Sequence, residues 1–106
     1  MNDALPPLDL DRMRASAQAV TALLRALANE DRLLLLCQMA HGEKSVGELE
    51  TDLDIHQPTL SQQLGVLRSE GLVTTRREGK RIYYTTANSK VLVLLNTLHA
   101  LYCDPE

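Results

Sequence analysis

The sequence predicts a mainly helical domain that carries one small β-hairpin. Leu is very frequent among the 106 residues, with 21 copies, whereas Val and Ile together number eight. Leu favours helices and β-branched residues favour strands, so most of the chain is expected to be helical. Apolar residues recur at helical spacing along most of the chain, and a period of two appears only after Gly71.

The chain is long enough for one domain and no more. We expect residues 1–8 to form a flexible N-terminal tail and residues 9–106 to form the domain. No apolar run reaches the roughly 18 residues that a membrane span needs, and the acidic, proline-broken N-terminus is unlike a signal peptide. The two cysteines lie 66 positions apart, which is not the pattern of a disulfide scaffold. These features predict a cytoplasmic protein that does not associate with membranes.

Two helices are predicted in the first 42 residues. The first covers residues 9–28, where apolar residues recur at helical spacing. The second covers residues 32–40, and we expect Asn29 to cap it and Gly42 to end it. Its run of five apolar residues, 33–37, covers more than one face of a helix, so we expect this helix to be deeply buried.

A pair of short helices is predicted next. Ser45 and Glu48 have the spacing of a capping box, so a helix is expected to begin there. Pro58 suits the first position of a second helix with Gln57 as its cap, and Gly71 is expected to end that helix. The two helices are joined by about four residues, which matches a helix-turn-helix in length.

The rest of the chain is predicted to form a hairpin and one more helix. The alternating pattern after Gly71 predicts two strands, with Gly79 in the turn between them. The last helix is expected from about Asn88 to Cys103, and its segment 91–95 is apolar nearly all round. A domain of this size has few internal partners for such a helix, so we expect a homodimer. The predicted order of elements is that of a winged helix-turn-helix.

The second helix of the pair and the hairpin carry the side chains that we expect to contact double-stranded DNA. The net charge is −3, but residues 57–84 hold five cations against two anions, which predicts a basic face on an acidic body. Amides and hydroxyls off the apolar stripe of the helix can pair with base edges, and hairpin cations suit phosphates or the minor groove. The expected contacts are Gln57, Thr59, Ser61, Gln62, Gln63 and Arg68 on the helix, and Arg76, Arg77, Lys80 and Arg81 on the hairpin.

Each of these surfaces also has an alternative interpretation without DNA. The polar helix face could be a solvated surface, and the charged hairpin could serve to discourage edge-to-edge strand pairing. The cysteines have a similar alternative, because free cysteine often packs as a small hydrophobe. Cys37, beside four leucines, fits that description, whereas Cys103 is expected to be accessible at a helix end.

The sequence contains few of the residue patterns that catalysis or metal binding requires. Neither cysteine has a sequence-local histidine to act as its base, and there is no Gly-rich phosphate loop. The three histidines, His41, His56 and His99, share no ligand spacing such as i, i+4. We therefore expect a non-enzyme with no cofactor and no bound metal, although the two cysteines could still form a thiolate site.

Over residues 10–103 the chain resembles the ArsR/SmtB family of repressors. The resemblance rests on the segments 27–33, 45–49, 57–68 and 76–84. It implies a homodimer on a palindromic operator, with the first and last helices forming the interface.

The two metal sites known in that family are poorly matched here. Ser45 and Gly47 stand at the positions of its Cys-x-Cys pair. The positions of the second site are taken by Asn88, Lys90, Leu101 and Asp104. At most one of these residues could bind a metal, so the resemblance does not favour metal sensing.

The placement of the two cysteines resembles the persulfide-responsive BigR/SqrR branch of the family. In that branch, cysteines on the second and last helices are joined within one subunit by a disulfide or a sulfur-bridged link, and the operator is released. The resemblance implies a dimeric repressor that binds its operator when reduced and leaves it when reactive sulfur species link Cys37 and Cys103. Its targets would be genes for sulfide or persulfide detoxification. The alternatives are a thiol-based metal-sensing repressor and a winged-helix protein-interaction module that does not bind DNA.

Overall fold

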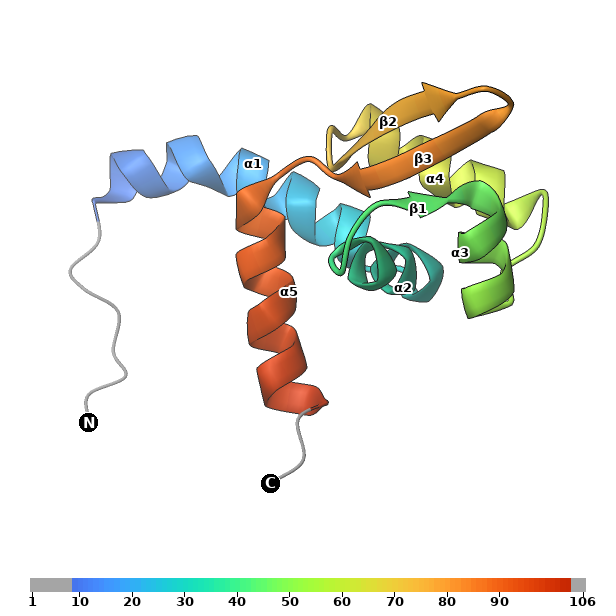
Figure 1. Cartoon of the computed structure of the whole chain (residues 1–106). Helices are drawn as coiled ribbons and strands as arrows, with labels where there is room; N and C mark the ends of the chain where they lie inside the picture. Colours follow the sequence, from blue (N-terminus) through green and yellow to red (C-terminus); the bar gives the residue numbers. More distant parts are fainter. Residues whose placement is uncertain (1–8, 104–106) are drawn as a thin grey trace.

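The computed structural model describes residues 9–103, so the expected tail at residues 1–8 lies outside the described residues (Figure 1). The described part contains five helices and three strands. They are α1 (Leu10–Leu27), α2 (Glu30–Met39), β1 (Lys44–Ser45), α3 (Val46–Leu53), α4 (Thr59–Ser69), β2 (Val73–Glu78), β3 (Arg81–Thr86) and α5 (Ser89–Tyr102). The predicted order of helix, helix, helix-turn-helix, hairpin and helix is confirmed.

Four of the five described helices begin at a polar cap, and the predicted caps Asn29 and Ser45 are among them. The side chain of Asn29 accepts the backbone N–H of Arg32 at 3.0 Å. Ser45 and Glu48 form both hydrogen bonds of a capping box, at 3.2 Å and 2.9 Å. These bonds satisfy N–H groups that have no partner within the helix.

The predicted cap of α4 is wrong. Pro58 itself occupies the N-cap position and the helix begins at Thr59, so Gln57 lies one residue too early to be the cap. The longer side chain of Gln57 reaches into the first turn instead, where its Oε1 accepts the backbone N–H of Ser61 at 3.1 Å. Gln57 therefore satisfies an exposed N–H of the helix start from outside the cap position.

The three strands form one antiparallel sheet in the order β1-β3-β2. The hairpin has a two-residue turn closed by the pair Glu78 and Arg81, and Gly79 in this turn has φ +62°, which favours glycine. Strand β1 pairs Ser45 with Tyr83 of β3 and leads directly into α3. The wing is thereby attached to the helix-turn-helix. Strand β1 was not predicted, because two residues are too few to show a period.

The core surrounds α2, whose residues Leu35, Leu36 and Met39 are at most 1% exposed. The predicted stripe of α4 is buried against it, with Leu60, Leu64 and Leu67 at most 2% exposed. The expectation that the whole run 33–37 is buried is wrong, because Leu34 and Cys37 are exposed. These two side chains are three residues apart on the face of α2 that the single chain leaves uncovered.

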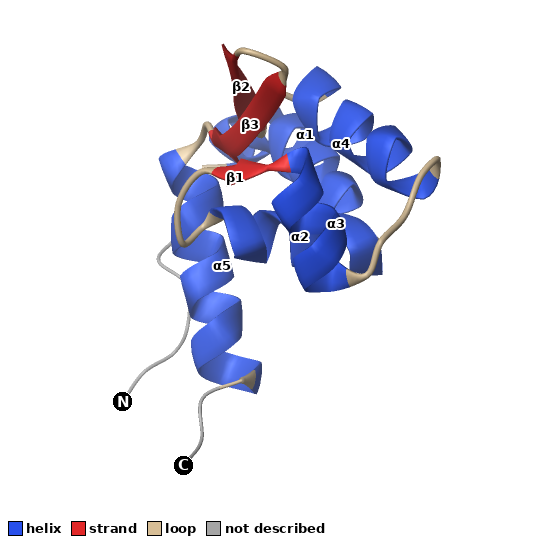
Figure 2. Cartoon of the chain, turned by 45° about the vertical axis from the view of Figure 1, so that its right-hand side comes forward, coloured by secondary structure: helices blue, strands red, loops and turns tan. Residues whose placement is uncertain are grey.

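The helices α1 and α5 extend from the body of the single chain (Figure 1), and Figure 2 shows α5 from another side. Both helices carry exposed apolar side chains. The exposed apolar residues on them are Leu10, Met13, Val20 and Leu24 of α1, and Val93, Leu101 and Tyr102 of α5. Val91 and Leu95 of α5 are buried within the chain, so only part of its apolar surface is left uncovered. Among residues 9–103 no helix is both long and apolar enough to cross a membrane.

Candidate nucleic-acid interface and cysteine pair

Most of the polar side chains expected to contact DNA are exposed on α4 or just before it. Gln57, Ser61, Gln62 and Arg68 are exposed and Thr59 is half-buried. The hydroxyl of Ser61 donates to Oε1 of Gln57 at 2.5 Å, so these two side chains form one polar unit at the start of the helix. An amide such as that of Gln62 can both donate to and accept from a base edge.

Gln63 differs from its neighbour Gln62 because it is half-buried and its side chain is engaged within the chain. Its Oε1 accepts a hydrogen bond of 2.9 Å from Nη1 of Arg32 on α2. Arg32 was not among the residues predicted to form the site. A signal was present, because a cation in the first turn of a helix opposes the helix dipole and needs a specific partner to hold it there.

Arg76 of the wing is also engaged within the chain. Its guanidinium donates to both carboxylate oxygens of Glu43 at 3.0 Å and 2.7 Å, donates to Glu78 at 2.7 Å, and lies 4.7 Å from the ring centre of Tyr83. The hydrogen bonds from Arg76 hold the pKa of the Glu43 carboxyl below its ordinary value. Arg76 therefore ties the wing to the loop before β1, and its charge is offset by two carboxylates.

The other three cations of the wing lie toward its turn. Arg77, Lys80 and Arg81 are all exposed, and Arg77 donates to the backbone oxygen of Gly79 at 3.3 Å. The structure thus divides the four wing cations that the sequence grouped together. Arg76 is paired with Glu43 and Glu78, and the other three cations surround the turn, where they can approach phosphates.

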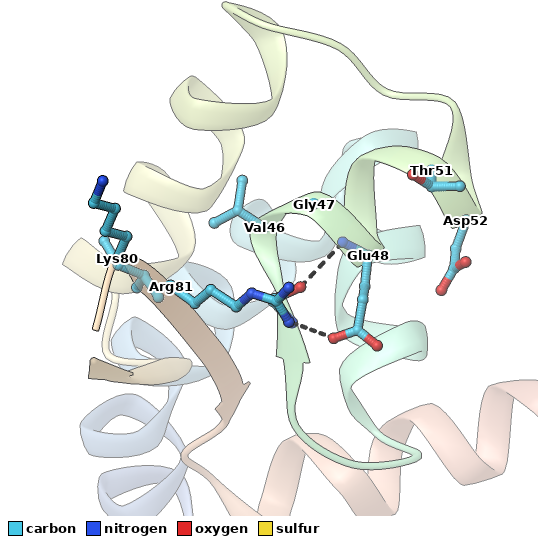
Figure 3. Close-up of a pocket in the computed structure, with 9 residues that line it drawn as sticks. Val46, Gly47, Glu48, Thr51, Asp52, Lys80 and Arg81 are labelled. Carbon is cyan, nitrogen blue, oxygen red and sulfur yellow. Dashed lines mark hydrogen bonds between the residues drawn. The ribbon is translucent and has the colours of Figure 1, made fainter. Parts of the chain in front are cut away.

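A cleft of about 750 Å³ separates the wing from α3 (Figure 3). Lys80 and Arg81 come from the wing, and Glu48 and Asp52 come from α3. The cleft also includes Ser45 and Gly47, the positions of the Cys-x-Cys pair in metal-sensing members of the resembled family, and neither offers a thiolate. Within residues 9–103, no group of three or more His, Cys, Asp and Glu side chains is arranged to hold a metal ion.

His56 joins the two helices of the helix-turn-helix. Its Nε2 lies 2.6 Å from Asp54, at the end of α3, and its Nδ1 lies 3.4 Å from Glu50. Hydrogen bonding to Asp54, and to a lesser degree to Glu50, raises the pKa of His56 above its ordinary value. The backbone oxygen of His56 accepts the N–H of Leu60, so the same residue also lies at the start of α4.

Both cysteines are free thiols on the surface of the single chain, Cys37 on α2 and Cys103 at the C-terminal end of α5. The interpretation of Cys37 as a buried hydrophobe is therefore wrong, and Cys103 is accessible as predicted. Partial burial raises the pKa of the Cys37 thiol above its ordinary value, and the negative charge of a Cys103 thiolate raises this pKa further. A charge on one thiol is thus felt by the other, although 66 positions separate them in the sequence.

The fold and this surface define a winged helix-turn-helix transcriptional regulator, and the comparisons with known proteins agree. Residues 29–75 match the model of the bacterial regulatory proteins of the arsR family. The chain is 53% identical over 105 residues to the biofilm growth-associated repressor of Agrobacterium fabrum. The alignment covers 94% of this chain and 90% of that protein. The chain belongs to the ArsR family, and its relatives are transcriptional regulators and not enzymes.

Solved structures give the same result for the fold. The transcriptional repressor BigR from Xylella fastidiosa superposes with a TM-score of 0.86 at 45% identity, covering 92% of this chain and all of that one. The winged helix-turn-helix domain of Mb0332 from Mycobacterium bovis, described as homodimeric, has a TM-score of 0.74 at 35% identity and covers 92% of this chain and 89% of that one. The predicted fold and the resemblance to the ArsR/SmtB family are confirmed.

The two kinds of predicted DNA contact are separable by mutation. We expect Gln62→Ala to weaken binding to the operator more than binding to unrelated DNA, because a lost base contact costs about 1–3 kcal/mol. Arg81→Ala should weaken binding to the operator and to unrelated DNA equally. It should also reduce the steepness of log affinity against log salt by about one, because one phosphate contact fewer releases about one ion fewer. Titrations of a specific and a random duplex over a salt series measure both effects. Equal losses on the two duplexes from Gln62→Ala would contradict a base-reading role for that residue.

The carboxylates around His56 predict a pH-dependent contribution to stability. The pKa of His56 is higher in the folded than in the unfolded protein, so protonated His56 stabilises the fold. This stabilisation is fully present below the ordinary histidine pKa of about 6.5, and it is lost as the pH rises through the pKa of His56 in the folded protein. His56→Gln should therefore lower the melting temperature more at pH 5.5 than at pH 9. His41→Gln, an exposed histidine outside this cluster, is the matched control. An equal loss at both pH values would refute the assigned role of His56.

Proposed function

We propose that this protein is a homodimeric repressor that works in the cytoplasm and binds a palindromic operator while Cys37 and Cys103 are reduced. Reactive sulfur species release it by linking the two thiols within one chain. The observation that carries the proposal is that both cysteines are free, exposed thiols, Cys37 on α2 and Cys103 at the end of α5. They lie close enough for a charge on Cys103 to raise the pKa of Cys37. Two accessible thiols on different helices that interact electrostatically can be joined by such a link.

The polar surface of α4 and the wing support the DNA-binding half of the proposal. Exposed amide and hydroxyl side chains occupy the face of α4 opposite its buried stripe, and three exposed cations surround the wing turn. An α-helix fits the major groove, where amides can distinguish base pairs, and cations near the wing turn gain from phosphate contacts.

The apolar surfaces of α1 and α5 support the dimer. Side chains such as Leu10 and Val93, each 66% exposed, and Leu101, 70% exposed, are large apolar groups on two helices that extend from the body. A second copy that covers both helices would remove this surface from water at about 25 cal/mol per Å². A twofold dimer would also present two copies of α4 to the two halves of a palindrome.

The link requires a sulfur donor that accepts two electrons. One cysteine thiolate attacks an S–S bond of a polysulfide and expels a thiolate, which leaves donor sulfur on the protein. The other cysteine thiolate attacks that mixed species, expels the second thiolate and closes the bridge. Both cysteines are oxidised, and the donor is reduced to two thiols that take up the two protons. A sulfur atom retained between the two Sγ atoms lengthens the bridge beyond the reach of a disulfide, which needs Cα atoms within about 7 Å.

The bridge would act on DNA binding through the positions of the helices. It ties α2, which packs behind α4, to α5, which contributes to the proposed dimer interface. A twofold dimer reads half-sites about one DNA turn apart, so a small change in the spacing of the two α4 helices removes contacts at one half-site. A tenfold loss of affinity requires only about 1.4 kcal/mol of preference for the unlinked form.

The dimer predicts the effect of a charge on the exposed face of α5. Val93→Glu should convert the reduced protein to a monomer in sedimentation experiments, because burying an unpaired carboxylate costs several kcal/mol. Val66→Glu, at an exposed valine of α4, is the matched control and should leave the dimer intact. A folded Val93→Glu variant that sediments as a dimer would place the interface elsewhere.

The switch is tested by single cysteine variants. Cys37→Ser and Cys103→Ser should each keep operator binding within about twofold, and each should lose the release that a polysulfide donor causes in the wild type, because one thiol cannot close the bridge. Fluorescence anisotropy measures release, and intact mass identifies the bridge and any sulfur retained in it.

Three other outcomes would overturn the proposal. Release of either single variant by the donor would exclude a two-thiol switch. Tight stoichiometric metal binding that releases the operator would favour a thiolate metal sensor. Failure of the reduced protein to bind any palindromic duplex at low salt would favour a protein-interaction module.

A further inference from the structure

The side chain of Arg32 joins three helices at one point. Its Nε donates to the backbone oxygen of Ala26 at 2.7 Å, and its Nη2 donates to that of Arg25 at 3.1 Å. Both oxygens lie in the last turn of α1, where a cation is favoured by the helix dipole. Its Nη1 donates to Oε1 of Gln63 on α4 at 2.9 Å.

We propose that Gln63 is a positioning residue, held by Arg32, which sets the orientation of α4 on the DNA and couples it to α2. The inference rests on the proposed function, because it concerns how a displacement of α2 by the cysteine bridge reaches the DNA-reading side chains. It also assigns Gln63 a different role from Gln62, its neighbour with the same side chain.

The geometry of the guanidinium supports this assignment. Its five N–H donors point in fixed directions within one plane, so two bonds to α1 also fix where the third donor points. That third bond is charge-assisted and has a half-buried amide oxygen as its acceptor, which makes it stronger than an exposed neutral pair. Gln63 is therefore held in a defined position relative to the ends of α1 and α2.

A fixed Gln63 determines where the neighbouring side chain points. Successive residues of an α-helix are about 100° apart around its axis, so holding position 63 sets the direction of Gln62 toward the DNA. Arg32 and Cys37 belong to the same ten-residue helix, in which Leu35 and Leu36 are fully buried. A bridge at Cys37 that displaces α2 would move Arg32 with it and change the orientation of α4.

A double-mutant cycle on specificity tests the pair. Arg32→Lys keeps the charge but not the planar fork, and Gln63→Met keeps the length of the side chain but not the acceptor. Each should lower the ratio of operator affinity to random-DNA affinity by about tenfold in the reduced protein, the size expected for a charge-assisted hydrogen bond. The double variant should lose no more than either single variant, because the two residues act as a unit.

Gln62→Met and Gln63→Glu complete the set. Because Arg32 and Gln63 set the direction of Gln62, Gln62→Met combined with Arg32→Lys should lower the specificity ratio by less than the product of the two single losses. Gln63→Glu restores an acceptor for Arg32 and should retain more of the specificity ratio than Gln63→Met, even if Arg32→Lys does not fold. Two results would overturn the positioning role. One is a specificity ratio in the double variant Arg32→Lys, Gln63→Met that falls by the product of the two single losses. The other is a specificity ratio in Gln63→Glu no higher than in Gln63→Met.

The donor response separates this inference from the proposed function. If the polysulfide donor releases the wild type, the folded Gln63→Met variant should respond at least threefold less, because its link between α2 and α4 is lost. An unchanged response would overturn the coupling role of the pair while leaving the cysteine switch intact. If the donor does not release the wild type, the proposed switch fails, and the double-mutant cycle still decides whether Arg32 positions Gln63.

Discussion

One face of α2 is buried because α1, α3, α4 and β3 all pack against this helix. Leu35, Leu36 and Met39 are at most 1% exposed and lie at the centre of the core. Burial of each such side chain contributes about 1.5–3 kcal/mol, so a rotation of α2 that exposed them would cost a large part of a small domain's stability. Since the helix has only ten residues, this packing decides where all its other side chains point.

Those other side chains give α2 its proposed roles. Arg32 lies at the first turn, where it bonds to the end of α1 and to Gln63 of α4. Cys37 lies further along on an exposed face, where its pKa responds to a charge on Cys103. Helix α2 thus has a thiol on one face and, near its start, a hydrogen bond to α4. In this account a chemical event at the thiol reaches DNA because α2 moves as a rigid unit.

The features that could be predicted from the sequence are mostly local. The caps at Asn29 and Ser45, the hairpin turn at Gly79 and the buried stripe of α4 each depend on residues within a few positions of one another. The features that were missed depend on partners far along the chain. The Arg32–Gln63 bond spans 31 positions and the Arg76–Glu43 pair spans 33, so no spacing rule could connect them. Exposure of Cys37 was missed because the sequence shows an apolar run but not which face of it is covered.

A reversible titration of the wild type shows whether one bridge between Cys37 and Cys103 controls operator affinity. Operator affinity is measured on a single preparation that is first reduced, then treated with a polysulfide donor, then reduced again, with intact mass determined at each stage. We expect at least a tenfold loss of affinity, about 1.4 kcal/mol, that coincides with an intrachain bridge and is fully recovered on reduction. Unchanged affinity in fully bridged protein, or release with both thiols still free, would contradict it.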